Sequence, residues 1–183
     1  LLPTGPDMDM VEKLVAEDPA IKGIWCVPKY SNPTGVSYSD ETVRRFAHLK
    51  PAAKDFRIFW DNAYSIHHLY DDKRDVILEL LNECVKAGNP DMVFKFISTS
   101  KVSFPGSGIA ALAASRANIE DAKSFMKFQT IGHDKLNQLR HVRFFKDMPG
   151  MYEHMRKHAA ILRPKFEKVE DVLEKEIGGL GIG

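Results

Sequence analysis

The chain has 183 residues, 44% of them hydrophobic, which suits one compact domain or one domain and part of another. Its 26 Lys and Arg residues nearly balance its 25 Asp and Glu residues, so its charge gives no reason to expect nucleic acid or an anionic membrane as a partner. The composition favours small-molecule chemistry instead.

The sequence shows no sign of export or of a membrane span. No run approaches ~18 apolar residues, and the first residues lack the succession of a signal peptide. Cys26 and Cys84 lie in apolar or helical stretches without metal-like spacing, so we expect packed thiols in a reducing cytoplasm and no metal. Because the chain begins at Leu1 and ends in the glycine-rich run 178–183, we also expect it to be a fragment.

Helical and strand patterns alternate along the first part of the chain. The predicted helices cover residues 8–17, 40–53 and 75–87, and the predicted strands cover 21–27, 56–60, 92–97 and 109–114. We expect Trp25, Phe59 and Trp60 to lie in the core. Such alternation predicts an α/β fold, with a mostly parallel sheet flanked by helices.

The pattern becomes helical from Asn118 onward. Turns are predicted at 131–132 and 148–150, and a long helical run at 152–177, which Pro164 should kink or divide. We place a domain boundary near residue 149, so that residues 1–149 form part of a large domain. Residues 150–183 then form a connecting helix and the start of a smaller α+β domain.

Three polar segments follow the predicted strands. They are Asn32-Pro33-Thr34-Gly35, Asp61-Asn62-Ala63-Tyr64 and Ser98-Thr99-Ser100-Lys101. In open α/β sheets, ligands bind beyond the carboxyl ends of the strands. The three segments are therefore expected to share one crevice.

Each segment alone has an ordinary structural explanation. Lys101 could be a solvated lysine in a polar turn, and Asn32 could belong to a simple turn. Asp61 could cap the following helix or turn, and Tyr64 could place its ring in the core and its hydroxyl in water. Together they supply what pyridoxal 5'-phosphate needs: an amine for a Schiff base, a carboxylate for the ring nitrogen and donors for the phenolic oxygen. Hydroxyl groups for the phosphate come from Ser98 and Ser100.

In order and spacing, these motifs resemble those of the fold type I pyridoxal-phosphate aminotransferases over almost the whole chain. The resemblance implies that Asn32, often with a cis peptide to Pro33, and Tyr64 hydrogen-bond the cofactor's phenolic oxygen. It also implies that Asp61 pairs with the pyridine nitrogen.

The same resemblance assigns the third segment. Lys101 is expected to form the Schiff base with the cofactor and then to carry the proton of the reaction. Ser98 and Ser100 match phosphate contacts, and a homodimer with shared active sites is implied. We expect the glycine-rich phosphate loop, the stacking aromatic residue and the substrate-carboxylate arginine to lie outside this chain.

One departure from the family pattern is clear. The family usually has an arginine about eight residues after the lysine to hold the phosphate, but no arginine follows Lys101 before Arg116. Ser103, Ser107 and backbone amides could replace it, or a residue outside this chain could do so. This shorter loop, together with His67 and His68 after Tyr64, resembles the corresponding segments of the bacterial class Ic aspartate aminotransferases, also called the alanine/MocR-like branch. We expect both histidines to be structural or to lie at the pocket rim.

The function most consistent with these residues is transfer of an amino group from an L-amino acid, first of all aspartate, to a 2-oxo acid such as 2-oxoglutarate in a ping-pong cycle. Two alternatives stay open. The chain could be the ligand-sensing domain of a MocR-type transcription regulator, or a β-lyase or decarboxylase on the same scaffold.

Overall fold

The structure, a computed structural model, describes residues 1–180. It divides into two compact units: residues 1–65 with 75–139, and residues 66–74 with those from Arg140 onward. The sheet and the three predicted site segments all belong to the first unit.

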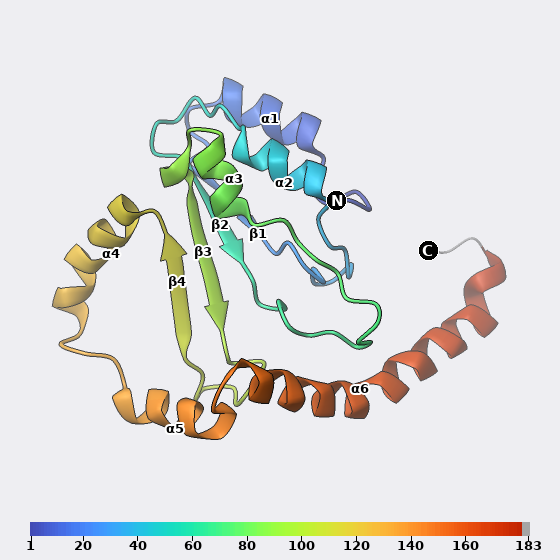
Figure 1. The fold of residues 1–183 in the computed structure, drawn as a ribbon. Helices are drawn as coiled ribbons and strands as arrows, with labels where there is room; N and C mark the ends of the chain where they lie inside the picture. Colours follow the sequence, from blue (N-terminus) through green and yellow to red (C-terminus); the bar gives the residue numbers. More distant parts are fainter. Residues whose placement is uncertain (181–183) are drawn as a thin grey trace. The chain divides into compact units, whose positions relative to one another are not determined.

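A four-stranded sheet runs through the first unit (Figure 1). Its strands are β1 (Gly23–Cys26), β2 (Arg57–Asp61), β3 (Val93–Ser98) and β4 (Ala110–Ala114), and they lie side by side in that order. β1, β2 and β3 are parallel, whereas β4 is antiparallel to β3. The predicted α/β class with a mostly parallel sheet is confirmed, and each predicted strand lies within two residues of its observed bounds.

The first unit contains four complete α-helices, each of which begins at a side-chain cap, and one 3-10 turn. They are α1 (Met8–Glu17), α2 (Asp40–Ala47), α3 (Leu80–Lys86), the 3-10 turn η1 (Pro90–Met92) and α4 (Arg116–Gln129). Asp7, Ser39, Glu79 and Ser115 each accept a hydrogen bond from a backbone N–H in the first turn of α1 to α4, respectively, which satisfies a donor that the helix leaves open. Figure 1 shows α1, α2 and α3 gathered beside the sheet.

The core lies between these three helices and one face of the sheet. Ile58 and Trp60 of β2 are fully buried there, and the ring of Trp60 meets Tyr38 and Phe46 edge-on at centroid distances of 5.6 and 5.7 Å. Because side chains alternate along a strand, Phe59 points to the opposite face. The prediction that Trp60 lies in the core is confirmed.

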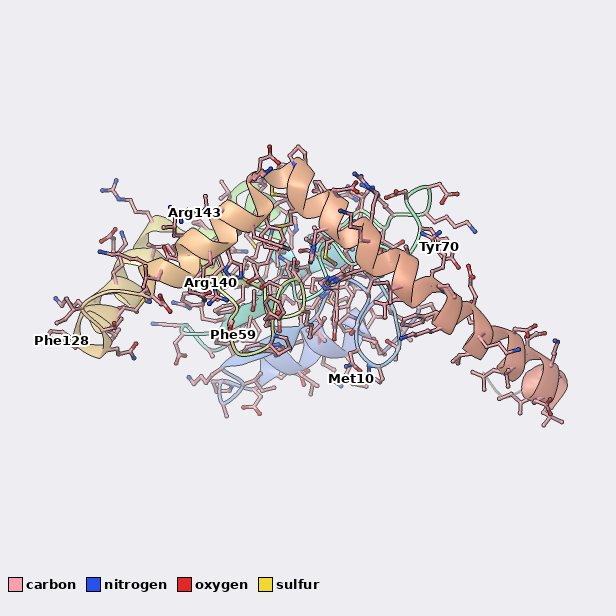
Figure 2. All side chains as sticks on the ribbon, turned by 90° about the horizontal axis from the view of Figure 1, so that it is seen from below. Met10, Phe59, Tyr70, Phe128, Arg140 and Arg143 are labelled. Atoms are coloured by element: carbon pink, nitrogen blue, oxygen red, sulfur yellow. The ribbon has the colours of Figure 1, made fainter. Side chains whose placement is uncertain are left out.

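The opposite face of the sheet carries an aromatic stack. Phe59, labelled in Figure 2, stacks on Trp25, Phe94 and Phe96 at centroid distances of 5.5, 6.1 and 6.2 Å. The prediction that Trp25 belongs to the core is wrong, since its side chain is 62% exposed. Its contacts are with neighbouring rings on the sheet surface.

Two predicted helices are longer than the observed ones. The helix expected over 75–87 begins only at Leu80, because Glu79 serves as its cap and the preceding Ile77 and Leu78 pack against the core in irregular backbone. The helix expected over 40–53 ends at Ala47, four residues before Pro51, and the residue before a proline disfavours helical backbone.

The second unit is built around a long helix. α5 (Lys135–Phe145) reaches into it, and α6 (Met148–Ile177) follows, with the 3-10 turn η2 (Gly178–Leu180) at its end. The predicted turn at 148–150 is instead the first turn of α6, where proline is tolerated and where Asp147 accepts a hydrogen bond from Gly150 N at 2.8 Å. α6 runs through Pro164 without a break, so a division there is wrong.

The segment 66–74 is fastened to α6. The Arg163 guanidinium donates to the carbonyl oxygen of Leu69 through Nε at 2.9 Å and also lies over the ring of Tyr70. The Tyr70 hydroxyl donates to Glu167 at 2.9 Å, and Figure 2 shows Tyr70 beside α6. These contacts join segment 66–74 to α6, although the two are far apart in sequence. The domain boundary expected near residue 149 stays a prediction.

Two further expectations concern single features of the chain. Cys26 and Cys84 are both buried and free, which confirms that they are packed thiols. Within residues 1–180, no helix is both long enough and apolar enough to cross a bilayer.

Trp60→Ala should lower the free energy of unfolding by about 3–5 kcal/mol, because it removes a fully buried ring and leaves a cavity. Trp60→Phe should cost clearly less, since it keeps an aromatic ring between Tyr38 and Phe46. Urea unfolding followed by circular dichroism measures both, and equal losses for the two variants would contradict the packing described.

Candidate functional site

Three loops leave the sheet at the same edge. Cys26 pairs with Trp60 and Asp61 pairs with Phe96, so the parallel strands β1, β2 and β3 end close to one another. β4 starts at this edge too, because Ala110 pairs with Ser98. The segments after these strand ends are the three polar segments that the sequence singles out.

Lys101 and Tyr64 are in direct contact across two of these loops. Lys101 Nζ donates to Tyr64 Oη at 2.9 Å and lies 4.1 Å from the centroid of the tyrosine ring. The Asn32 side chain hydrogen-bonds to the same tyrosine. The structure therefore brings together one residue from each of the three segments.

This arrangement makes the Tyr64 phenol more acidic. The hydrogen bond from Lys101 contributes most to lowering the pKa of Tyr64 below its ordinary value, and the hydrogen bond to Asn32 and the positive charge of Lys101 act in the same direction. Partial burial and the negative charge of Asp61 oppose the shift. A tyrosine with such neighbours releases its proton more readily than an isolated one.

Asp61 is the last residue of β2 and is half-buried. The strand pairing continues beyond it, since Asn62 N donates to Phe96 O at 2.9 Å, and this holds the backbone of Asp61 in place. Its charge acts on Tyr64, so the carboxylate belongs to the same group of side chains. Its pairing with a pyridine nitrogen stays a prediction.

Asn32 is connected to Pro33 by a cis peptide bond, as the motif implies. Ser31 N donates to Val36 O at 2.9 Å and Gly35 N donates to Ser31 O at 2.6 Å, so the motif forms a closed turn. Gly35 adopts a positive φ of 72°, which glycine allows at little cost. The turn presents the Asn32 side chain toward Tyr64.

Ser98 and Ser100 form a compact pair at the end of β3. Ser98 Oγ donates to Ser100 Oγ at 3.0 Å, and Ser100 N donates to Ser98 Oγ at 3.1 Å. Gly108 approaches them closely, because a Cβ at this position would lie 2.9 Å from Ser100 N. Hydroxyl groups beside closely approaching backbone amides can bind an anion. The phosphate role of both serines stays a prediction.

Thr99 closes the loop that carries Lys101. Thr99 N donates to Ile109 O, and Ile109 N donates to Thr99 Oγ1, both at 2.9 Å. Ser103 Oγ donates to Thr99 O at 3.1 Å, and Asn137 Nδ2 donates to Ser107 O at 2.9 Å from α5. Sequence reasoning did not predict that Thr99 and Asn137 hold this loop in shape, since no local pattern shows which backbone groups they bond to.

Arg116 does not take the place of the missing phosphate arginine. β4 runs antiparallel to β3, so Ala114 pairs with Phe94 while Ala110 pairs with Ser98. Arg116 follows the far end of β4 and begins α4. It therefore leaves the sheet at the edge opposite Ser98.

His67 and His68 lie in the second unit, with segment 66–74. Their structural or rim role stays a prediction. No group of three or more His, Cys, Asp or Glu side chains able to hold a metal ion occurs among residues 1–180.

Comparison with known proteins gives a consistent result. The family model described as aspartate amino-transferase matches residues 1–183. A protein of Mycolicibacterium smegmatis, named as a candidate aminotransferase, is 48% identical over 174 residues, which is 95% of this chain and 40% of that protein. The aspartate aminotransferase of Corynebacterium glutamicum is 42% identical over 178 residues, or 97% of this chain and 41% of that protein.

A solved structure agrees with the described fold. An aspartate transaminase from Corynebacterium glutamicum superposes with a TM-score of 0.94 at 40% identity, covering 99% of this chain and 42% of that one. The chain thus spans about two fifths of the length of the curated relatives it matches.

Lys101→Met should raise the pKa of Tyr64 toward its ordinary value of about 10, because it removes both the donor and the positive charge. Asn32→Ala should raise it by less. Carbon-13 NMR of labelled tyrosine, with Tyr64→Phe to assign the signal, measures the titration in protein free of cofactor. An unchanged titration in Lys101→Met would refute the contact.

Proposed function

This chain belongs to the aspartate amino-transferase family, and from that membership we propose that the protein containing it is a pyridoxal-phosphate-dependent aminotransferase. Its substrates would be an L-amino acid, aspartate first, and a 2-oxo acid such as 2-oxoglutarate, used in turn. The observation that carries the proposal is the contact of Lys101 with Tyr64, beside Asn32 and Asp61, at the carboxyl edge of a parallel sheet.

The residues present fit pyridoxal phosphate in their chemistry. Lys101 offers an amine, Asp61 a carboxylate, and Tyr64 and Asn32 offer donors for a phenolic oxygen. Gly108 leaves room where a Cβ would press on the backbone of Ser100, as a phosphate cradle requires. We propose these residues, with Ser98 and Ser100, as the cofactor ligands.

When bound, the cofactor supplies an aldehyde carbon and an electron-withdrawing ring. Lys101 acts as the nucleophile, for which its amine must first lose a proton. Tyr64 Oη lies 2.9 Å from Lys101 Nζ and its pKa is lowered, so it is placed to share this proton. Asp61 brings a negative charge to the edge where a protonated ring nitrogen would need one.

The choice of aspartate is supported by the relative from Corynebacterium glutamicum that is named for it, at 42% identity. The resemblance of the motifs supports a homodimer. Location in the cytoplasm is part of the same proposal, in keeping with the two free thiols.

The full-length protein with pyridoxal phosphate should show the visible absorbance band of a cofactor attached to a lysine amine. Aspartate should remove this band, and 2-oxoglutarate should restore it. Borohydride reduction followed by mass spectrometry should place the cofactor on Lys101. Lys101→Ala should lose the attachment, whereas Lys54→Ala should keep it; a band that no amino acid perturbs would contradict a transaminase and favour a sensor.

Gly108→Ala should weaken binding of pyridoxal phosphate by about tenfold or more, because the new Cβ displaces Ser100 and disturbs a charge-assisted contact. Gly132→Ala is the matched control, since a Cβ there meets nothing within 4 Å. Titration of the cofactor-free protein measures both dissociation constants. Equal affinities would show that Ser100 does not hold the phosphate.

A further inference from the structure

Lys29 is a buried lysine beside the site. It is among the most enclosed charged residues that the structure describes, with only 9% of the residue exposed. A buried ammonium group is costly unless it is hydrogen-bonded. Lys29 Nζ donates to the carbonyl oxygen of Ser65 at 3.0 Å and lies 5.3 Å from the ring centroid of Tyr30, a cation–π contact.

The two ends of this hydrogen bond lie on two different site loops. Lys29 stands three residues before Asn32, in the loop after β1, and Ser65 directly follows Tyr64, in the turn after β2. Ser65 N also donates to Asn62 O at 3.3 Å, which closes that turn. The hydrogen bond from Lys29 to the Ser65 carbonyl therefore restrains the backbone that carries Tyr64.

The loop that contains Lys29 is itself held in shape. Tyr38 N donates to Pro28 O at 2.8 Å, which closes the loop at its base. Tyr30 adopts a positive φ of 48°, unusual for a residue with a side chain, and its N–H donates to Ser37 Oγ at 3.2 Å. This backbone directs the Lys29 side chain across to the neighbouring turn.

We propose that Lys29 is a positioning residue that locks the turn of Tyr64 to the loop of Asn32, so that both side chains meet at one point. The role rests on the proposed function insofar as that point is the cofactor's phenolic oxygen. Lys29 acts through the Ser65 carbonyl and does not itself have to touch the cofactor or the substrate.

The chemistry of the bond explains why a lysine stands here. A charged donor makes a hydrogen bond to a carbonyl roughly twice as strong as a neutral one. Methionine has a stem of similar length but cannot donate, whereas arginine keeps the charge and the donors. The two substitutions therefore separate loss of the bond from a change of side-chain shape.

The test uses the full-length protein and two readouts. The first is the pKa of Tyr64 in protein free of cofactor, followed by carbon-13 NMR of labelled tyrosine and assigned with Tyr64→Phe. The second is the dissociation constant of pyridoxal phosphate. Lys29→Met should move the pKa of Tyr64 toward its ordinary value of about 10 and raise the dissociation constant about tenfold, and Lys29→Arg should restore much of both.

Lys22→Met is the matched control. Lys22 is exposed and forms an ion pair with Asp55 at 2.7 Å, just before β1 at the other end of the strand. Its replacement should leave both readouts unchanged. A shift of the Tyr64 pKa in Lys22→Met as large as in Lys29→Met would overturn the specific role of Lys29.

The remaining outcomes separate this proposal from the proposed function. If Lys29→Met titrates and binds cofactor like the wild type, the positioning role is wrong and the aminotransferase proposal stands. If the wild type binds no pyridoxal phosphate but Tyr64 still shifts in Lys29→Met, the positioning role stands and the function fails. If Lys29→Met does not fold while Lys22→Met does, Lys29 serves the fold as a whole and the local role is overturned.

Discussion

The parallel backbone pairing of β1, β2 and β3 is the interaction on which the site depends. It brings three strand ends to one edge, with Cys26 opposite Trp60 and Asp61 opposite Phe96. A slip of one residue in this pairing would turn the Trp60 side chain out of the core. The packing of Trp60 on one face of the sheet therefore determines where Asp61 and the neighbouring loops leave the sheet. Trp60 does this from the core, without being one of the site residues.

At that edge, charge and hydrogen bonding replace packing as the organising force. Tyr64 receives a hydrogen bond from the charged Lys101 and is bonded to Asn32, while Asp61 adds a negative charge nearby. Lys101 is exposed to solvent. The buried Lys29 is different, because it is enclosed among the loops and its bond to Ser65 is shielded. One lysine is thus open to solvent, whereas the other is enclosed and bonded to the backbone of a neighbouring loop.

The sequence predicted that the segments of Asn32, Asp61 and Lys101 follow strands, because apolar runs that end in polar turns are local signals. It did not predict the burial of Lys29, since that depends on a carbonyl group 36 residues away. Nor did it predict the exposure of Trp25, because a strand pattern does not tell which face of a sheet the helices cover. The late start of α3 has a similar cause: Ile77 and Leu78 satisfy the core from irregular backbone, and tertiary packing overrides helical periodicity.

The loop after Lys101 contains no arginine before Arg116 and is held in shape by hydrogen bonds. An arginine grips phosphate with a planar charged fork that tolerates small errors in the backbone, whereas hydroxyl and amide donors must be placed accurately to replace it. The loop has the features that such accuracy needs: Thr99 joins both of its ends, Asn137 holds Ser107, and Gly108 lets Ser100 lie close. Because Arg116 leaves the sheet at the opposite edge, the order of this loop comes from its own backbone and hydroxyl contacts and from Asn137.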